Sequence, residues 1–177
     1  MMEQTGEKKV PLLEMQGFRV LFPGRKGPMA AVDGVDLSIY PGGIVGVVGE
    51  SGSGKSVMSQ SILRLREYET SLRYEGSIRF EGQDLLQLPL SALRQIRGNR
   101  ISVIFQDPLT SLSPVHTVGK QMGEVLRLHK KLSRKEALER SGELLHLVGL
   151  PDPARRLRQY PYELSGGMQP REMIAMA

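Results

Sequence analysis

The sequence predicts an α/β fold into which a helical subdomain is inserted, and three observations predict it. Residues 44–48 form a continuous apolar run bounded by glycines, as in a parallel-sheet strand that is covered on both faces. A glycine-rich turn and a helix-spaced apolar pattern follow, and residues 101–105 form a second apolar run. From about Pro108 the pattern is helical without a strand-like run. We therefore expect an α/β part over residues 1–110 and a helical part over residues 111–177.

Two strands are expected before the first apolar run. Residues 12–22 form a loose strand pattern, and Val35, Leu37 and Ile39 alternate with polar residues as in a strand with one buried face. Residues 41–43, Pro-Gly-Gly, then turn the chain. These segments predict an N-terminal antiparallel β subdomain.

Helices are expected wherever apolar residues recur three or four positions apart. The first such set is Met58, Ser61, Ile62 and Leu65, and the second is Val118, Met122, Val125, Leu126 and His129. The clearest helix opens with Ser133 and Glu136, which fit a capping box, and Gly149 and Pro151 end it.

Composition and charge restrict the function classes only loosely. The formal net charge is +5, but Lys and Arg are scattered rather than gathered in one tract, so the charge is weak support for a nucleic-acid or membrane partner. The chain has no cysteine, which fits a reducing compartment. Its start is polar, and no apolar run approaches the ~18 residues of a membrane span. We expect a cytoplasmic protein that docks on something membranous.

A phosphate-binding loop is the most specific motif. The motif G-x-x-x-x-G-K-[ST] occurs between an apolar run and a helix pattern. Its residues are Gly49, Glu50, Ser51, Gly52, Ser53, Gly54, Lys55 and Ser56. Glycines let successive amides point at phosphate oxygens, and the next helix adds its positive end. Lys55 is expected to reach the β and γ phosphates of ATP, and Ser56 to ligate Mg²⁺. The alternative is a glycine-rich turn in a core.

Two further stretches distinguish this loop from those of kinases and GTPases. Residues 103–108 end in Gln106-Asp-Pro, 51 residues after Lys55, and Leu-Ser-Gly-Gly begins 58 residues after Gln106. Together they resemble the Q-loop and the signature motif of ATP-binding cassette (ABC) proteins, with a RecA-like P-loop NTPase lobe and an inserted helical subdomain. The amino-acid sequences of residues 49–56, 104–114 and 173–177 are similar to those of ATPase subunits of dipeptide, oligopeptide and nickel importers.

The resemblance implies roles for further residues. Phe22 matches the aromatic position that stacks on adenine, although an ordinary core aromatic is an equal alternative. Gln106 would help to hold Mg²⁺ and the attacking water, unless it is simply a polar loop residue. Ser165, Gly166 and Gly167 would cap the next helix and face the γ-phosphate held by an opposite subunit, rather than serve as a plain cap. Two ATP molecules would then join a head-to-tail dimer.

The resemblance also implies partners. These are a second ATPase subunit, identical or a sister, the membrane permease subunits and, indirectly, an external substrate-binding protein. A soluble ABC ATPase acting on DNA or ribosomes is the alternative within the fold, but no coiled-coil arm or cysteine-rich insertion occurs, and we expect no nucleic-acid partner. An inactive nucleotide-binding remnant is another alternative. A GTPase is weaker, since no Asn-Lys-x-Asp appears.

The chain departs from the family pattern in two ways. No apolar run ends in Asp-Glu, so the Walker B pair and the switch histidine are not found, and we expect ATP binding without hydrolysis by this chain alone. The same absence would leave sheet edges exposed and make an aggregation-prone monomer. Pro170 and Glu172 stand where the family usually has glutamine and an apolar residue. With Ser165 as the N-cap, Pro170 would remove one helical bond, at a cost of up to ~3 kcal/mol.

Overall fold

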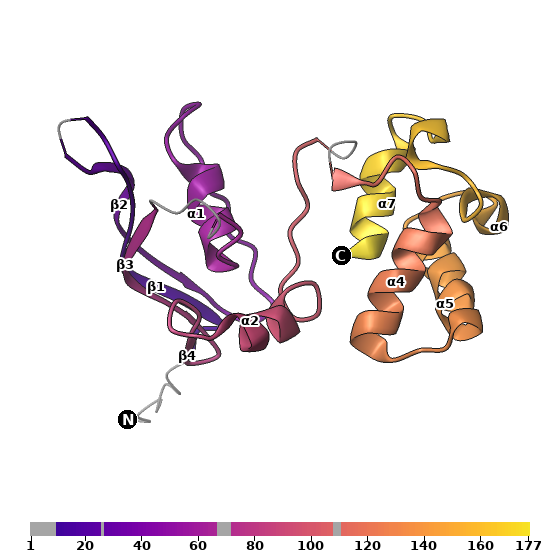
Figure 1. Cartoon of the computed structure of the whole chain (residues 1–177), viewed down its shortest axis with the longest axis horizontal. Coiled ribbons are helices and arrows are strands. Elements are labelled where there is room, and N and C mark those ends of the chain that lie inside the picture. The colour runs from indigo at the N-terminus through magenta and orange to yellow at the C-terminus, as the bar shows by residue number, and fades with distance from the viewer. Residues whose placement is uncertain (1–9, 26, 67–71, 108–110) are drawn as a thin grey trace, which may run out of the picture. The chain divides into compact units, whose positions relative to one another are not determined.

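The computed structural model describes residues 10–25, 27–66, 72–107 and 111–177. The chain forms two compact units, Met1–Leu93 and Arg94–Ala177 (Figure 1). This division rests on backbone contacts alone, so the functional domain boundary predicted at residue 110 stays a prediction.

The first unit is built on a four-stranded antiparallel sheet. In spatial order β2-β1-β3-β4, its strands are β2 (Met29–Ile39), β1 (Leu13–Phe22), β3 (Arg73–Phe80) and β4 (Gln83–Asp84). Along β1, Leu13 pairs with Ile39 on one side and with Phe80 on the other. The predicted strands 12–22 and 35–39 are confirmed, and so is the turn at residues 41–43, where Gly43 N–H donates to Tyr40 O over 3.1 Å.

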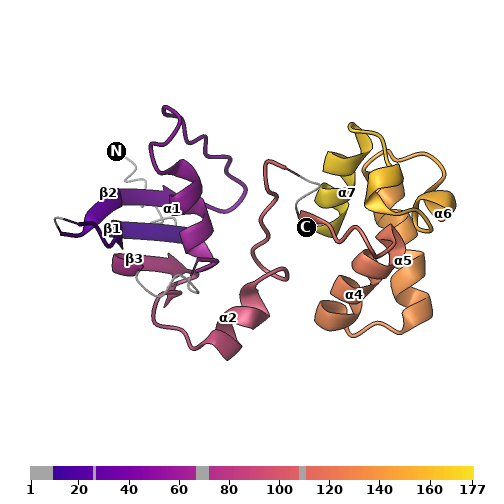
Figure 2. The same ribbon diagram turned by 45° about the horizontal axis from the view of Figure 1, so that its top comes forward.

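Two helices accompany this sheet. Helix α1 (Lys55–Ile62) packs against β2 (Figure 2). It buries Met58 and Ser61. Helix α2 (Leu90–Ile96) follows β4. The core comprises fully or almost fully buried apolar side chains from the strands and from the segment after β4: Met15, Phe18, Val20, Ile78, Leu85 and Leu93. Strand β1 supplies three of them, and its alternation of buried and exposed residues shifts phase between Met15 and Phe18, where a bulge interrupts the register.

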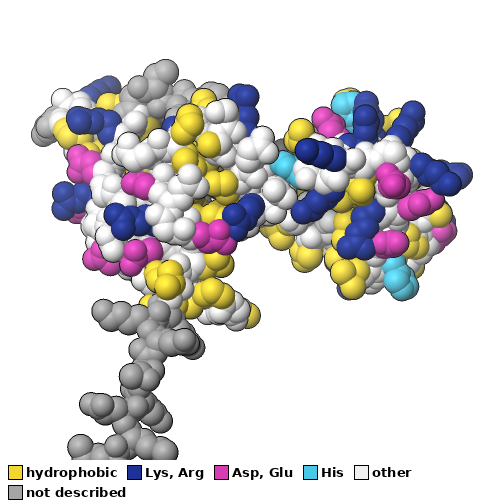
Figure 3. Space-filling view, turned by 90° about the horizontal axis from the view of Figure 1, so that it is seen from below, with side chains coloured by type: hydrophobic (Ala, Val, Ile, Leu, Met, Phe, Trp, Pro, Cys, Tyr) yellow, Lys and Arg dark blue, Asp and Glu magenta, His cyan; other side chains and the backbone are white. Residues whose placement is uncertain are grey.

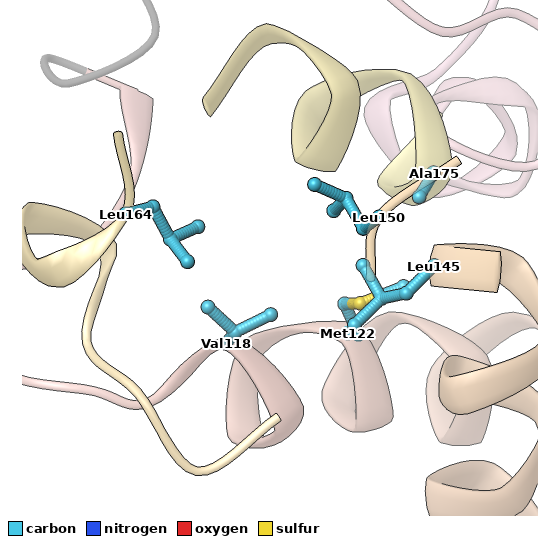
Figure 4. Close-up of a cluster of buried hydrophobic side chains, with 6 residues drawn as sticks. All are labelled: Val118, Met122, Leu145, Leu150, Leu164 and Ala175. Atoms are coloured by element: carbon cyan, nitrogen blue, oxygen red, sulfur yellow. The ribbon is translucent and has the colours of Figure 1, made fainter. Parts of the chain in front are cut away.

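The second unit is helical. It contains α4 (Val118–Lys130), α5 (Arg134–Leu147), α6 (Pro153–Arg156), the 3₁₀ turn η1 (Pro161–Glu163) and α7 (Met168–Met176). Its core, drawn in Figure 4, consists of Val118, Met122, Leu145, Leu150, Leu164 and Ala175. Across the described part of the chain, no helix has both the length and the apolar character that a bilayer crossing needs.

Side-chain caps explain where these helices begin. Ser133 Oγ accepts from Glu136 N–H over 3.3 Å, and Ser133 N–H donates to Glu136 Oε2 over 2.8 Å, which confirms the predicted capping box. Thr117 caps α4 through a single bond, since its Oγ1 accepts from Lys120 N–H over 3.4 Å. Gly149, with φ of 73°, follows α5 in the left-handed conformation that glycine adopts without strain.

The two apolar runs predicted as buried parallel strands are not strands in this structure. Residues 44–48 have no sheet partner among the described residues, and Ile44 and Val48 are 101% and 94% exposed. Residues 102–105 are likewise unpaired within the described ranges, and Ile104 and Phe105 are exposed. A strand buried on both faces needs neighbouring strands and covering helices, and the strands described here pair only with one another.

Candidate functional site

The phosphate-binding loop leads directly from the exposed run at 44–48 into α1. Gly52 and Gly54 have φ of 83° and 88°, a conformation that residues with a Cβ adopt only under strain. A Cβ at Gly54 would overlap the carbonyl oxygen of Ala31 on β2. The motif's second glycine is therefore required for α1 to start where it does.

The Lys55 side chain folds back across the loop. Its Nζ donates to Gly49 O over 2.7 Å and to Glu50 O over 2.6 Å, with Ser53 Oγ at 3.3 Å. A Cβ at Gly49 would lie 2.9 Å from Ser53 Oγ. A side chain at the first glycine would therefore crowd the oxygens that Lys55 Nζ contacts. The ammonium is held at the loop by neutral oxygens, which an anion can replace.

Backbone amides of this loop are available to an anion. Among the N–H groups from Gly52 to Val57, the only one that donates to a described group is that of Ser53, which bonds Glu50 O over 3.2 Å. Five amides are thus left at the positive end of α1, next to an ammonium and the exposed Ser56 hydroxyl. This donor set fits the phosphates of a nucleotide, and a serine hydroxyl fits a Mg²⁺ ligand.

Phe22 ends β1 as a half-buried ring. The guanidinium carbon of Arg66 lies 5.3 Å from its ring centroid, within cation–π range. The structure therefore gives Phe22 an arginine partner, and the adenine-stacking role stays a prediction.

Gln106 is exposed at a bend. It belongs to the unit Arg94–Ala177, whereas the phosphate-binding loop belongs to Met1–Leu93. The predicted sharing of Mg²⁺ between Gln106 and Ser56 therefore stays a prediction.

The predicted signature residues form an exposed turn. Leu164 is buried, whereas Ser165, Gly166 and Gly167 are exposed, and their three N–H groups donate to no group in the described part of the chain. The prediction that Ser165 is the N-cap is wrong. Helix α7 begins at Met168 with Gly167 as N-cap, and the carbonyl of Ser165 accepts from Met168 N–H over 2.8 Å and from Gln169 N–H over 3.3 Å in the turn that leads into the helix.

The structure agrees with the predicted effect of Pro170, which is the third residue of α7. Gln169 N–H donates to Ser165 O over 3.3 Å, at the four-residue spacing of an α-helix, whereas Pro170 has no N–H to donate to Gly166 O. One backbone hydrogen bond is therefore missing at the start of the helix, although the fixed φ of proline suits a first turn.

Sequence reasoning missed Gln169 as a positioning residue. Its buried Nε2 donates to Pro161 O over 3.3 Å and to Leu164 O over 3.2 Å, so it ties the start of α7 to the segment before the Ser-Gly-Gly turn. The sequence did offer a signal, because Gln169 lies four positions before the apolar Met173 and so shares a helix face with it.

Glu172 is the second residue of α7 that departs from the family pattern. Its side chain is fully buried, and neither carboxylate oxygen has a hydrogen-bond partner within the described ranges of the chain. Burial raises the pKa of Glu172 to about 7 from its usual value of 4.5. An apolar residue would be buried at this position without that cost.

Comparisons with known proteins agree with the motif order. Residues 32–177 match the family model described as ABC transporter. The chain is 48% identical over 174 residues to a probable peptide ABC transporter ATP-binding protein of Sinorhizobium fredii, covering 98% of this chain and 52% of that protein. It is 49% identical over 167 residues to a peptidoglycan transport ATP-binding protein of Agrobacterium fabrum, covering 94% and 31%. The first of these relatives is thus about twice as long as the matched chain.

A solved structure shares the fold. It is a dimeric ATP-binding cassette in a post-hydrolysis state, bound to ADP and phosphate. The TM-score is 0.79 at 27% identity, over 93% of this chain and 68% of that one. The predicted α/β fold class with a P-loop NTPase lobe is therefore confirmed, although two of its expected strands are unpaired among the described residues.

Proposed function

Because this chain belongs to the ABC transporter family, we propose that it is the nucleotide-binding part of an importer subunit that binds Mg·ATP and drives peptide transport. The inactive remnant remains the alternative that experiment must exclude.

One observation carries the proposal: at the start of α1, five amides that donate to no described group lie beside the Lys55 ammonium. Phosphate oxygens would take over the bonds that Lys55 Nζ now makes to Gly49 O and Glu50 O. Ser56 would place its hydroxyl on Mg²⁺, and Gln106 would contribute to the same ion. ATP with Mg²⁺ supplies the energy of transport when bound, and the loop residues bind and orient its phosphates.

The Ser-Gly-Gly turn supports a second role, in dimerisation. Three exposed residues precede α7, and their amides, which donate to no group among the described residues, suit the γ-phosphate of a nucleotide held by a second subunit. The related solved cassette is a dimer. We infer a head-to-tail dimer with an identical or sister subunit.

The named relatives support the substrate class. One relative is named for peptide transport and another for peptidoglycan transport, and peptide units are common to both. Permease subunits in the membrane would then be the partners that move the peptide, with an external binding protein delivering it. In such an assembly, this subunit is expected at the cytoplasmic face of the membrane.

The chain alone is proposed to bind ATP without hydrolysing it. No apolar run in its 177 residues ends in Asp-Glu, so the sequence offers no such pair to activate water. Phosphoryl transfer depends on such positioned groups.

Isothermal titration of the chain with Mg·ATP tests the proposal. Wild type is expected to bind, and Lys55→Ala to lose at least tenfold in affinity, because it removes the cation that faces the phosphates. Ser56→Ala is expected to weaken binding in Mg²⁺ but not in EDTA. Ser59→Ala is the matched control, since Ser59 Oγ only donates to Ser56 O within α1, and it should bind as wild type does.

Two outcomes of these measurements would contradict the proposal. Absence of heat with folded wild type at millimolar Mg·ATP would make the chain a remnant. Phosphate release by wild type that disappears in Lys55→Ala would contradict the part of the proposal that denies hydrolysis.

A further inference from the structure

The two units carry very different charge. Residues 94–177 contain fourteen Lys and Arg against eight Asp and Glu, a net charge of +6. Residues 1–93 contain ten against eleven, a net charge of −1. Figure 3 shows dark blue basic side chains spread over the helical unit, on the right. The excess positive charge of the protein thus belongs to the helical unit, a bias that the absence of one long basic tract did not reveal.

The charge is densest at the turn between α4 and α5. Within residues 127–135, which we call the basic turn, there is no acidic residue, and all five Lys and Arg side chains are exposed: Arg127, Lys130, Lys131, Arg134 and Lys135. Leu128, among them, is 71% exposed.

Few of these cations are neutralised by neighbours. Lys135 Nζ lies 3.9 Å from Glu139 Oε1 in an exposed pair, and Lys130 Nζ donates to the neutral Asn99 Oδ1 over 3.1 Å. Among the described residues, Arg127, Lys131 and Arg134 form no ion pair. The nearby Glu136 carboxylate is engaged in the capping box.

Helix stability does not explain the basic turn. Cations in the last turn of a helix suit its negative end, which accounts for Arg127 and Lys130 on α4. Arg134 and Lys135 are instead the first two residues of α5, where the positive helix end disfavours them. Their charge works against the fold and points to an anionic partner outside the chain.

We propose that the basic turn docks on the anionic phospholipid headgroups of a membrane. Clusters of four to eight Lys and Arg on amphipathic helices attract anionic lipid surfaces. Each cation strengthens binding by about fivefold. The exposed Leu128 can enter the boundary between headgroups and acyl chains. The segment has no Phe, Tyr or Trp on which a nucleic-acid base could stack, which disfavours RNA or DNA.

Vesicle co-sedimentation without nucleotide tests this docking independently of the proposed function. Wild type is expected to bind phosphatidylcholine vesicles containing 30% phosphatidylglycerol, and to be released at 0.5 M salt. The triple variant Lys131→Gln, Arg134→Gln, Lys135→Gln should lose on the order of a hundredfold in partitioning. Leu128→Ser, which keeps the charge, should lose a few-fold.

A second triple variant controls for net charge. Lys120→Gln, Arg155→Gln, Arg158→Gln removes three exposed cations outside the basic turn and should lose much less. Circular dichroism verifies that each variant is folded. Equal losses in both triple variants, equal binding to pure phosphatidylcholine vesicles, or tighter binding to a 20-nucleotide RNA that depends on the same three cations would overturn the proposal.

Discussion

The two units of this protein differ in how they bury their apolar residues. The helical unit closes its core with residues that lie within about 60 positions of one another, from Val118 to Ala175. In the first unit, the antiparallel strands are packed, but the apolar run at 44–48 is exposed. Helices satisfy their own backbone and need only one covered face, whereas a parallel strand needs partners on both edges and both faces. Local sequence patterns can therefore specify the helical unit more completely than a parallel sheet.

Removing a side chain from the helical core should give the largest effect. Leu145 is fully buried, and Leu145→Ala is expected to lower the free energy of unfolding by about 2–5 kcal/mol. Leu147→Ala, on the same helix but 79% exposed, should change it by less than about 0.5 kcal/mol. Urea unfolding followed by circular dichroism measures both, and amide exchange shows where the loss occurs. Equal loss of protection in β1 and α5 would refute a separately stabilised helical unit.

The buried carboxyl group of Glu172 should make the free energy of unfolding depend on pH, with an effect of similar size. Its pKa is raised to about 7 in the folded state, so between pH 4.5 and 7 the folded state keeps a proton that the unfolded state has lost. The free energy of unfolding should therefore fall as pH rises across this window, by about 3 kcal/mol, and level off above it.

Urea unfolding at pH 5 and pH 8 checks this dependence. Glu172→Gln should remove most of the fall, because the neutral amide does not titrate. Glu124→Gln, an exposed change on α4, should keep it. The same pH dependence in Glu172→Gln as in wild type would assign it to other groups.

The capping box should give the smallest of these effects. Ser133→Ala removes the oxygen that accepts from Glu136 N–H and should cost about 1 kcal/mol. Chemical denaturation with Ser59→Ala as the exposed serine control measures it. An unchanged midpoint would mean that packing of α4 on α5, rather than the cap, fixes the start of this helix.

The sequence predicted elements whose signals are local. The capping box at Ser133, the glycine stop at Gly149 and the alternation at residues 35–39 all appear as expected. Strand β3 was missed although Tyr74, Ile78 and Phe80 alternate with polar residues, because Gly76 interrupts the pattern at a bulge.

The misassigned elements depend on contacts that are distant in sequence or on backbone geometry. Whether residues 44–48 pair as a strand depends on neighbours that no local pattern reveals. The start of α7 depends on a tight turn at Ser165 and on Gln169, which reaches back to Pro161 and Leu164. For the site, the sequence motif identified the residues of the phosphate-binding loop. Only the structure shows which of their amides donate to no described group.

Amide chemical shifts in a ¹⁵N-labelled sample test the central claim most directly, since that claim concerns the backbone N–H groups at the start of α1. On adding Mg·ATP, and also Mg-tripolyphosphate, the amides of Gly52, Gly54, Lys55 and Ser56 should shift the most, and Lys55→Ala should abolish the shifts at the same concentration. If these amides stay unmoved at saturating nucleotide while others shift, the phosphate cradle is not the binding site.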